Sequence, residues 1–142
     1  MKWAIFDSEG NGLRPDLFYC LSWENNEDKK TITNYDEMRR FLSEHDVIIG
    51  HNIILFDIPN LERVLGVKYS GTAIDTLVLS WYLYNERRTH GLEDWGTELG
   101  IPKPEITDWE NLKLEEYIHR CESDREITKR LWDKQVAYLK TL

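Results

Sequence analysis

The chain has 142 residues, 41% of them hydrophobic, and six Trp, seven Tyr and four Phe, which suits a single folded domain over 1–142 and excludes a mainly disordered segment. Its formal net charge of −8 argues against a general nucleic-acid coat protein, which neutralises phosphates with an excess of Lys and Arg. The acidity leaves room for an enzyme whose carboxylates hold divalent cations, because those ions then supply the positive charge.

The two cysteines, Cys20 and Cys121, lie far apart and form no CxxC pair, which disfavours a zinc knuckle. Two thiols, together with an N-terminus whose apolar run is too short for a signal sequence, predict a reducing, cytoplasmic setting. No apolar run approaches the length of a membrane span, so we expect no membrane partner.

The first predicted element is a buried strand at Trp3–Phe6, which ends at Asp7. A second strand is predicted at Leu17–Trp23 and a short third one at Thr31–Thr33. The polar residues between these strands predict turns, so the three strands are expected to be antiparallel neighbours.

Helices and strands alternate in the middle of the chain. Asn34 is typical of a helix cap and predicts a helix over Tyr35–His45. A short buried strand is predicted at Asp46–Asn52, and a helix closed by its glycine is predicted at Leu55–Gly66.

The last predicted strand is Thr72–Asp75, after which only helices follow. Thr76–Asn85 is apolar nearly all round, which predicts a buried helix. A short helix at Gly91–Leu99 precedes a long helical stretch at Leu112–Leu139, whose pattern leaves a break near 119–121 open. This order predicts an α/β domain with a mixed five-stranded central sheet flanked by helices.

The stretch FDSEGNGL, Phe6–Leu13, places Asp7 and Glu9 at the carboxyl end of the first strand, where such sheets carry their active sites. Residues two apart on a strand point to the same face, so the two carboxylates converge if the strand continues through Glu9. Such a pair repels unless a cation lies between its members. Taken alone, the stretch favours a solvated strand end with two unrelated acids.

Two later stretches also place an aspartate beside an element boundary. In HNIILFDIPNL, His51–Leu61, Asp57 opens a helix and gains from the helix dipole, and taken alone the stretch favours an ordinary helix-terminal acid. In HRCESDREIT, His119–Thr128, Asp124 follows His119 by five residues, and a histidine beside a hydrated metal can accept a proton from water. The simpler interpretation of Asp124 is an exposed acid on an amphipathic helix.

Taken together, in this order and spacing, the three stretches resemble the three motifs of the DEDD (DnaQ-like) 3′–5′ exonucleases, which have a ribonuclease H-like fold. The second stretch, with Ile74–Asn85 and Thr89–Gly100, looks most like the proofreading domain of phage-type family A DNA polymerases. The similarity runs from about Trp3 to Leu131. It implies that the catalytic, metal-binding carboxylates are Asp7, Glu9, Asp57 and Asp124.

The resemblance implies a two-metal-ion enzyme that uses Mg²⁺ or Mn²⁺, ions that suit all-oxygen ligands. Two ions about 3.5–4 Å apart stabilise the attacking and leaving oxygens of an in-line displacement. The implied substrate is the 3′ end of single-stranded or frayed DNA, which is hydrolysed to nucleoside monophosphates. The implied setting is proofreading in trans beside a DNA polymerase, with a phage-encoded protein in the host cytoplasm as one form of it.

Two alternatives stay open at this point. The first is an exoribonuclease that acts on short RNA, because the fold does not settle which sugar is recognised. The second is a catalytically inactive nucleic-acid-binding or interaction module of the same fold. The retention of all four carboxylates disfavours the inactive module, because a mutually repelling cluster has little use without a metal.

The general base is where the sequence departs from its polymerase relatives. One branch of the family has a tyrosine four residues before the last aspartate, and that position here is Arg120, which stays protonated. The other branch has a histidine five residues before it, and His119 matches this DEDDh pattern. Five residues of an unbroken helix rotate by roughly 140°, so His119 works only if the helix starts or kinks beside it. Tyr117 is the alternative base.

Three further residues are predicted to contact the substrate. Leu13 stands where the family places an apolar wedge against the terminal base, with plain core packing as an equal alternative. Asn52 is expected to position the substrate or support the site, or else to cap a turn. Phe56 is expected to stack near the 3′ nucleotide, or else to pack in the interior.

Overall fold

The computed structural model describes residues 1–101, 103–106, 108 and 111–142, and a sheet with the strand order β3-β2-β1-β4-β5 forms their centre. β2 lies antiparallel to both β1 and β3, whereas β4 lies parallel to both β1 and β5. The mixed five-stranded sheet expected from the sequence is therefore confirmed. Its strands are β1 (Trp3–Gly10), β2 (Phe18–Glu24), β3 (Lys29–Ile32), β4 (Val47–Gly50) and β5 (Thr72–Asp75).

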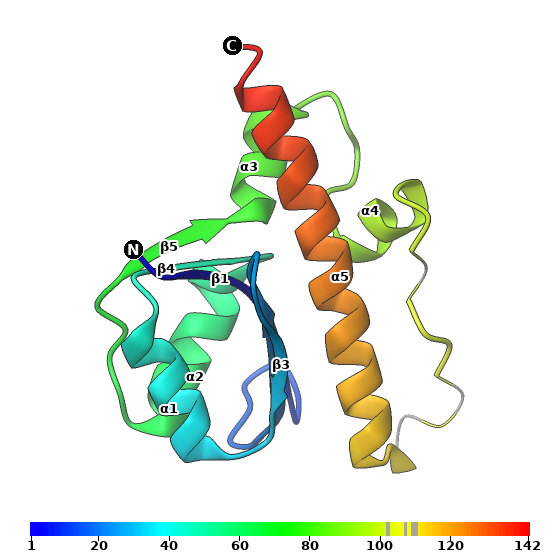
Figure 1. Cartoon of the computed structure of the whole chain (residues 1–142). Helices are drawn as coiled ribbons and strands as arrows, with labels where there is room; N and C mark the ends of the chain where they lie inside the picture. Colours follow the sequence, from blue (N-terminus) through cyan, green and yellow to red (C-terminus); the bar gives the residue numbers. More distant parts are fainter. Residues whose placement is uncertain (102, 107, 109–110) are drawn as a thin grey trace.

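Helices cover both faces of the sheet (Figure 1). On one face, α1 (Tyr35–Glu44) and α2 (Ile58–Leu65) enclose the main apolar core with the strands. On the other face, the long helix α5 (Leu114–Leu139) crosses β1 and β2. Two short helices, α3 (Thr76–Leu83) and α4 (Leu92–Glu98), pack against α5. None of the helices among the described residues is long and apolar enough to cross a membrane.

The first strand extends further than the sequence predicts. Ala4, Ile5 and Phe6 are fully buried because helices cover both faces of the strand. The strand then continues to Gly10, since Asp7 and Glu9 remain paired with β2. The expected end at Phe6 is wrong, and the condition for convergence of the two carboxylates is met.

The link between β4 and α2 also differs from the prediction. Instead of one helix over Leu55–Gly66, a π-helical turn, η1 (Ile53–Asp57), precedes α2. The Asp75 carboxylate accepts backbone hydrogen bonds from Asn52 and Ile54, which holds this wide turn in place. The predicted closing glycine is confirmed, because Gly66 has a φ of 67° just after α2.

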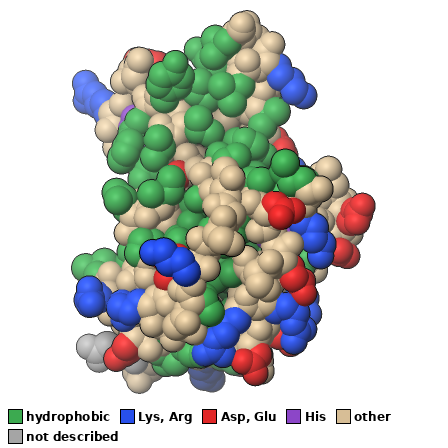
Figure 2. Space-filling view, turned by 90° about the vertical axis from the view of Figure 1, so that its left-hand side faces the viewer, with side chains coloured by type: hydrophobic (Ala, Val, Ile, Leu, Met, Phe, Trp, Pro, Cys, Tyr) green, Lys and Arg blue, Asp and Glu red, His purple; other side chains and the backbone are tan. Residues whose placement is uncertain are grey.

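The buried helix predicted at Thr76–Asn85 is buried on one side only. Val78, Trp81 and Tyr82 of α3 are 48%, 49% and 74% exposed, respectively. Figure 2 views the molecule from the left-hand side of Figure 1 and shows apolar side chains gathered over the upper part, where α3 lies. For this helix, an apolar sequence on all sides does not mean that all sides are buried.

The long C-terminal helix has no break. α5 is helical throughout Leu114–Leu139, including residues 119–121. The sequence allowed a break near residues 119–121, and the helix has none there. His119 therefore lies within a continuous helix.

Candidate active site

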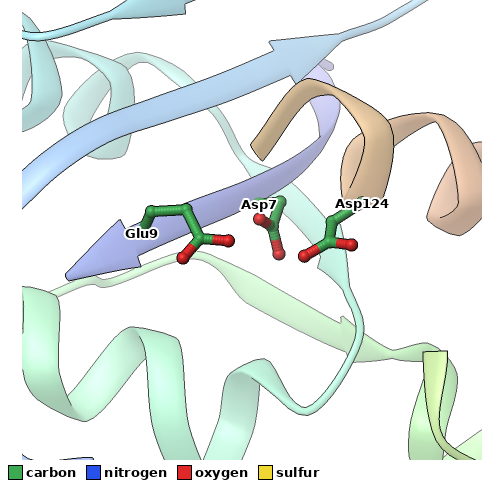
Figure 3. A group of neighbouring side chains, drawn as sticks. All are labelled: Asp7, Glu9 and Asp124. Carbon is green, nitrogen blue, oxygen red and sulfur yellow. The ribbon is translucent and has the colours of Figure 1, made fainter. Parts of the chain in front are cut away.

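Three of the predicted carboxylates converge at one point of the molecule. Asp7 and Glu9 extend from β1, and Asp124 extends toward them from α5 (Figure 3). One oxygen from each of the three side chains lies within 4.8 Å of the other two. Three converging carboxylate oxygens are ligands of the type that hard divalent cations prefer.

Burial is the main reason why the carboxyl groups of this cluster are hard to ionise. The pKa of Asp7 is raised well above its usual value, first by burial and then by the neighbouring carboxylates. Burial raises the pKa of Glu9 to about 7 against the lowering effect of Arg120. Burial likewise raises the pKa of Asp124, although Lys103 and Arg120 act in the opposite direction. A cation among these groups would remove much of the penalty of ionising them.

Two carboxylate oxygens of the cluster are suited to receive such a cation. Asp7 Oδ2 is buried and accepts no hydrogen bond from the described residues. Asp124 Oδ1 is buried and equally without a hydrogen bond in the described chain, with Lys103 Nζ 3.4 Å away as its ion-pair neighbour. Because buried polar atoms normally have partners, these two oxygens fit a site for a metal ion.

Asp57 lies beside the cluster without belonging to the set of three. It stands where η1 meets α2, and its Oδ2 accepts a hydrogen bond of 2.6 Å from Ser8 Oγ. Burial raises the pKa of Asp57 to about 7, against the effect of the Ser8 hydrogen bond. The charge of Asp57 in turn raises the pKa of Asp7. All four predicted carboxylates are therefore at one end of the sheet, and three of them could share one ion.

Two cationic side chains that were not predicted from the sequence as site residues reach these carboxylates. Lys103 Nζ lies 3.4 Å from Asp124 Oδ1, and Arg120 Nε lies 3.5 Å from Glu9 Oε1. Arg120 precedes Asp124 by four residues on α5, a spacing that puts both on one helix face and could have revealed it. Lys103 comes from the connection between α4 and α5, where the sequence has no signal for it.

The predicted general base is not brought to the carboxylates. The side chain of His119 is exposed, and the uninterrupted helix turns it away from the face that carries Asp124. The kink on which its role depended is absent. Tyr117, the alternative, stacks on Tyr19 with ring centroids 4.0 Å apart, and burial raises its pKa. A tyrosine accepts a proton only as the phenolate, which a raised pKa makes rarer.

A pocket of about 480 Å³ opens beside Glu9, within the size range of small-ligand sites. Leu13, Phe56, Tyr117 and Arg120 are among the residues that line it. The Leu13 side chain is 94% exposed, which excludes the core-packing alternative for this residue. The structure therefore brings two of the three predicted substrate contacts to the pocket that adjoins the carboxylates.

The third predicted contact, Asn52, is placed differently. It is partly buried, has a left-handed φ of 61° and forms the N-terminal boundary of η1. Its backbone N–H donates to Asp75 Oδ1 at 2.8 Å. Asn52 is not among the residues that line the pocket, so its observed contact supports the turn that leads to Asp57.

Solved structures match the chain, whereas comparisons of its sequence find no match. No protein-family model matches the chain, and no curated protein matches it in sequence. A nuclease solved in its apo form matches with a TM-score of 0.74 and 20% identity, over 99% of this chain and 74% of the nuclease. NrnC of Brucella melitensis with bound Mg²⁺ matches with a TM-score of 0.74 and 18% identity, over 99% of this chain and 75% of NrnC. NrnC bound to pGG gives a TM-score of 0.74 at 16% identity, over 99% and 74% of the two chains.

These likenesses have low sequence identity and nearly complete coverage of the chain. They confirm the α/β, ribonuclease H-like fold that the sequence led us to expect. The solved structures that share this fold include a nuclease and NrnC of Brucella melitensis.

Proposed function

We propose that the protein is a metal-dependent 3′–5′ exonuclease, which releases nucleoside monophosphates from single-stranded or frayed DNA ends. The observation that carries this proposal is the convergence of Asp7, Glu9 and Asp124 within 4.8 Å at the end of β1. Buried like charges disfavour each other's ionisation, so this arrangement is useful chiefly when it binds a cation. The pocket beside Glu9 supplies the adjoining space for a nucleotide.

The proposed cofactor is Mg²⁺ or Mn²⁺, bound as two ions. Asp7, Glu9 and Asp124 would hold one ion, and Asp57 beside them would contribute to the second. The Mg²⁺ bound to NrnC, a protein of the same fold, supports the use of a divalent ion. When bound, such ions stabilise the charge that develops on the attacking and leaving oxygens of a phosphodiester.

The proposed reaction is hydrolysis of the terminal phosphodiester bond. A water oxygen bonds to phosphorus and loses a proton, while the bond from phosphorus to the 3′ oxygen breaks and that oxygen takes up a proton. The products are a 5′-nucleoside monophosphate and a chain that is one nucleotide shorter. In this scheme, Leu13 and Phe56 on the pocket wall contact the terminal base. Asn52 supports the site through the turn that leads to Asp57.

Short RNA is the second candidate substrate, and one observation favours it. NrnC, which has the same fold, was solved with pGG bound. Proofreading in trans of a DNA polymerase is the role proposed for the DNA activity, and degradation of short RNA is the role for the alternative.

The test uses 5′-labelled DNA and RNA of one sequence, incubated with Mg²⁺, with Mn²⁺ or with a chelator. We expect a ladder that shortens from the 3′ end, released monophosphates, and no products with the chelator. Asp124→Asn should abolish the ladder. Asp133→Asn is the matched control, because Asp133 is an exposed residue of the same helix that pairs with Lys129. Absence of turnover on both substrates with both ions would leave only the inactive binding module.

A further inference from the structure

Arg120 lies where the carboxylate cluster and the nucleotide pocket meet. Its Nε is 3.5 Å from Glu9 Oε1, and its side chain lines the pocket together with Leu13 and Phe56. It stands one helical turn before Asp124, on the face of α5 that is turned toward the cluster. One guanidinium therefore borders both the ionisable oxygens and the space for a ligand.

A nucleotide that enters this pocket brings a negatively charged phosphate toward several carboxylates. A positively charged side chain beside these carboxylates favours the approach of the phosphate, because it offsets their repulsion of the ligand. A guanidinium can supply that charge, because it stays protonated and its planar fork of N–H donors matches the oxygens of a phosphate. The Arg120 side chain is 25% exposed, so it is partly accessible to a ligand while it pairs with Glu9.

Lys103 is the other cation near the cluster, and its position differs. It pairs with Asp124 and is not among the residues that line the pocket. The pocket wall therefore favours Arg120 over Lys103 as the partner of a bound nucleotide.

We propose that Arg120 binds the phosphate that hydrolysis leaves on the released nucleotide, and that this chain uses position 120 for substrate binding rather than for proton transfer. The inference rests on the proposed function, because it assigns a residue to the substrate phosphate of that reaction. It gives the site phosphate selectivity at a position where the polymerases that the sequence resembles have a tyrosine.

Binding of the product tests this assignment without any catalytic turnover. The ligands are adenosine 5′-monophosphate, its deoxy form, and the two corresponding nucleosides, titrated calorimetrically in the presence of Mg²⁺. We expect the wild-type protein to prefer each monophosphate to its nucleoside. Arg120→Ala should weaken monophosphate binding by roughly 10- to 100-fold, as expected for the loss of a charged hydrogen bond, and leave nucleoside binding unchanged. Arg120→Lys should restore part of the loss.

The matched control is Arg130→Ala, which removes the same charge from an exposed site on the same helix, where Arg130 pairs with Glu126. It should bind all four ligands like the wild type. The assignment is overturned if the wild type shows no preference for monophosphates, or if Arg120→Ala keeps that preference. An increase in hydrolysis by Arg120→Tyr would also overturn it, because the position would then serve proton transfer.

The two proposals fail in distinguishable ways. Hydrolysis by a wild type whose phosphate preference survives Arg120→Ala would leave the exonuclease standing and remove the role of Arg120. Phosphate-selective binding that depends on Arg120, in a protein without turnover on DNA or RNA, would remove the exonuclease and leave a phosphate-binding site.

Discussion

The Cys121 thiol donates a hydrogen bond of 3.2 Å to the backbone carbonyl oxygen of Asp7, which connects α5 to β1 directly beside the carboxylate cluster. Both partners belong to elements that pack closely, since Cys121 is fully buried and α5 lies across β1. Asp124 is one turn further along the same helix and is thereby held opposite Asp7. The position of the helix on the sheet is what assembles the site.

A buried ion pair fixes that position on the neighbouring strand. Arg125 donates to Ser22 Oγ at 2.6 Å and to Glu24 Oε1 at 3.2 Å, which joins α5 to β2. Arg125→Ala should lower the free energy of unfolding by about 3–5 kcal/mol, because it leaves the Glu24 charge buried without its partner. Urea denaturation measures the free energy of unfolding, and Arg125→Lys should lower it less than Arg125→Ala does. Lys129→Ala is the control, because this pair with Asp133 is exposed and should contribute less than about 1 kcal/mol.

Removal of one carboxylate should separate stability from function. Asp7→Asn relieves repulsion within the cluster, so we expect the metal-free protein to become more stable by about 1 kcal/mol, or roughly 2–4 °C in melting temperature. The same change should abolish hydrolysis and the increase in melting temperature caused by Mg²⁺. Thermal melts with and without Mg²⁺ measure the stability and the effect of the metal, and the assay with 5′-labelled DNA measures hydrolysis. A variant that keeps wild-type activity would refute Asp7 as a metal ligand.

The metal-free protein should lose stability as the pH rises from about 4 to 7. Burial raises the pKa of Glu9 from 4.5, and that of Asp57 from 3.8, to about 7. At a pH between the pKa of the unfolded state and that of the folded state, the native protein binds more protons than the unfolded protein. The free energy of unfolding therefore falls with increasing pH. Melting temperatures in a chelator should show this, and Asp57→Asn should flatten the slope. Mg²⁺ should have its largest stabilising effect above pH 7, where the ligands ionise readily. A slope that Asp57→Asn leaves unchanged would contradict this account.

Substitution of His119 tests whether this residue is the general base that the motif implies, although the geometry of α5 turns it away from Asp124. A general base typically contributes 10²–10⁴-fold to the rate. Because His119 is exposed on an uninterrupted helix, we expect His119→Ala to change kcat by far less than this factor. Tyr117→Phe is the parallel variant, because Tyr117 lines the pocket. A loss of 10² or more confined to His119→Ala would show that α5 rearranges when substrate binds.

The convergence of the carboxylates was predictable because the three stretches together match the order and spacing of a known set of motifs, although each stretch alone favours an ordinary acid. Asp7 and Glu9 obey the two-residue period of a strand, and Asp124 lies within the motif of its own helix. Lys103 was not predictable, since it lies in a connection without periodicity and reaches Asp124 only through the tertiary fold. The loss of His119 from the site has the same origin, because whether a helix bends depends on what it packs against.

Elements outside the site show the limits of local patterns as well. The π-helical turn before Asp57 depends on the carboxylate of Asp75, which is distant in sequence. The apolar pattern of α3 indicated burial all round, yet Trp81 and Tyr82 face outward. Apolar periodicity identifies a helix, but how many of its sides are covered depends on the number of elements that pack against it.

The most direct test of the central claim is a crystal structure with Mn²⁺ and a nucleoside monophosphate, in which anomalous scattering locates the metal. We predict Mn²⁺ bound by Asp7, Glu9 and Asp124, with the nucleotide in the pocket lined by Leu13 and Phe56. Crystals that contain the nucleotide but no Mn²⁺ at these carboxylates, at saturating Mn²⁺, would contradict the account.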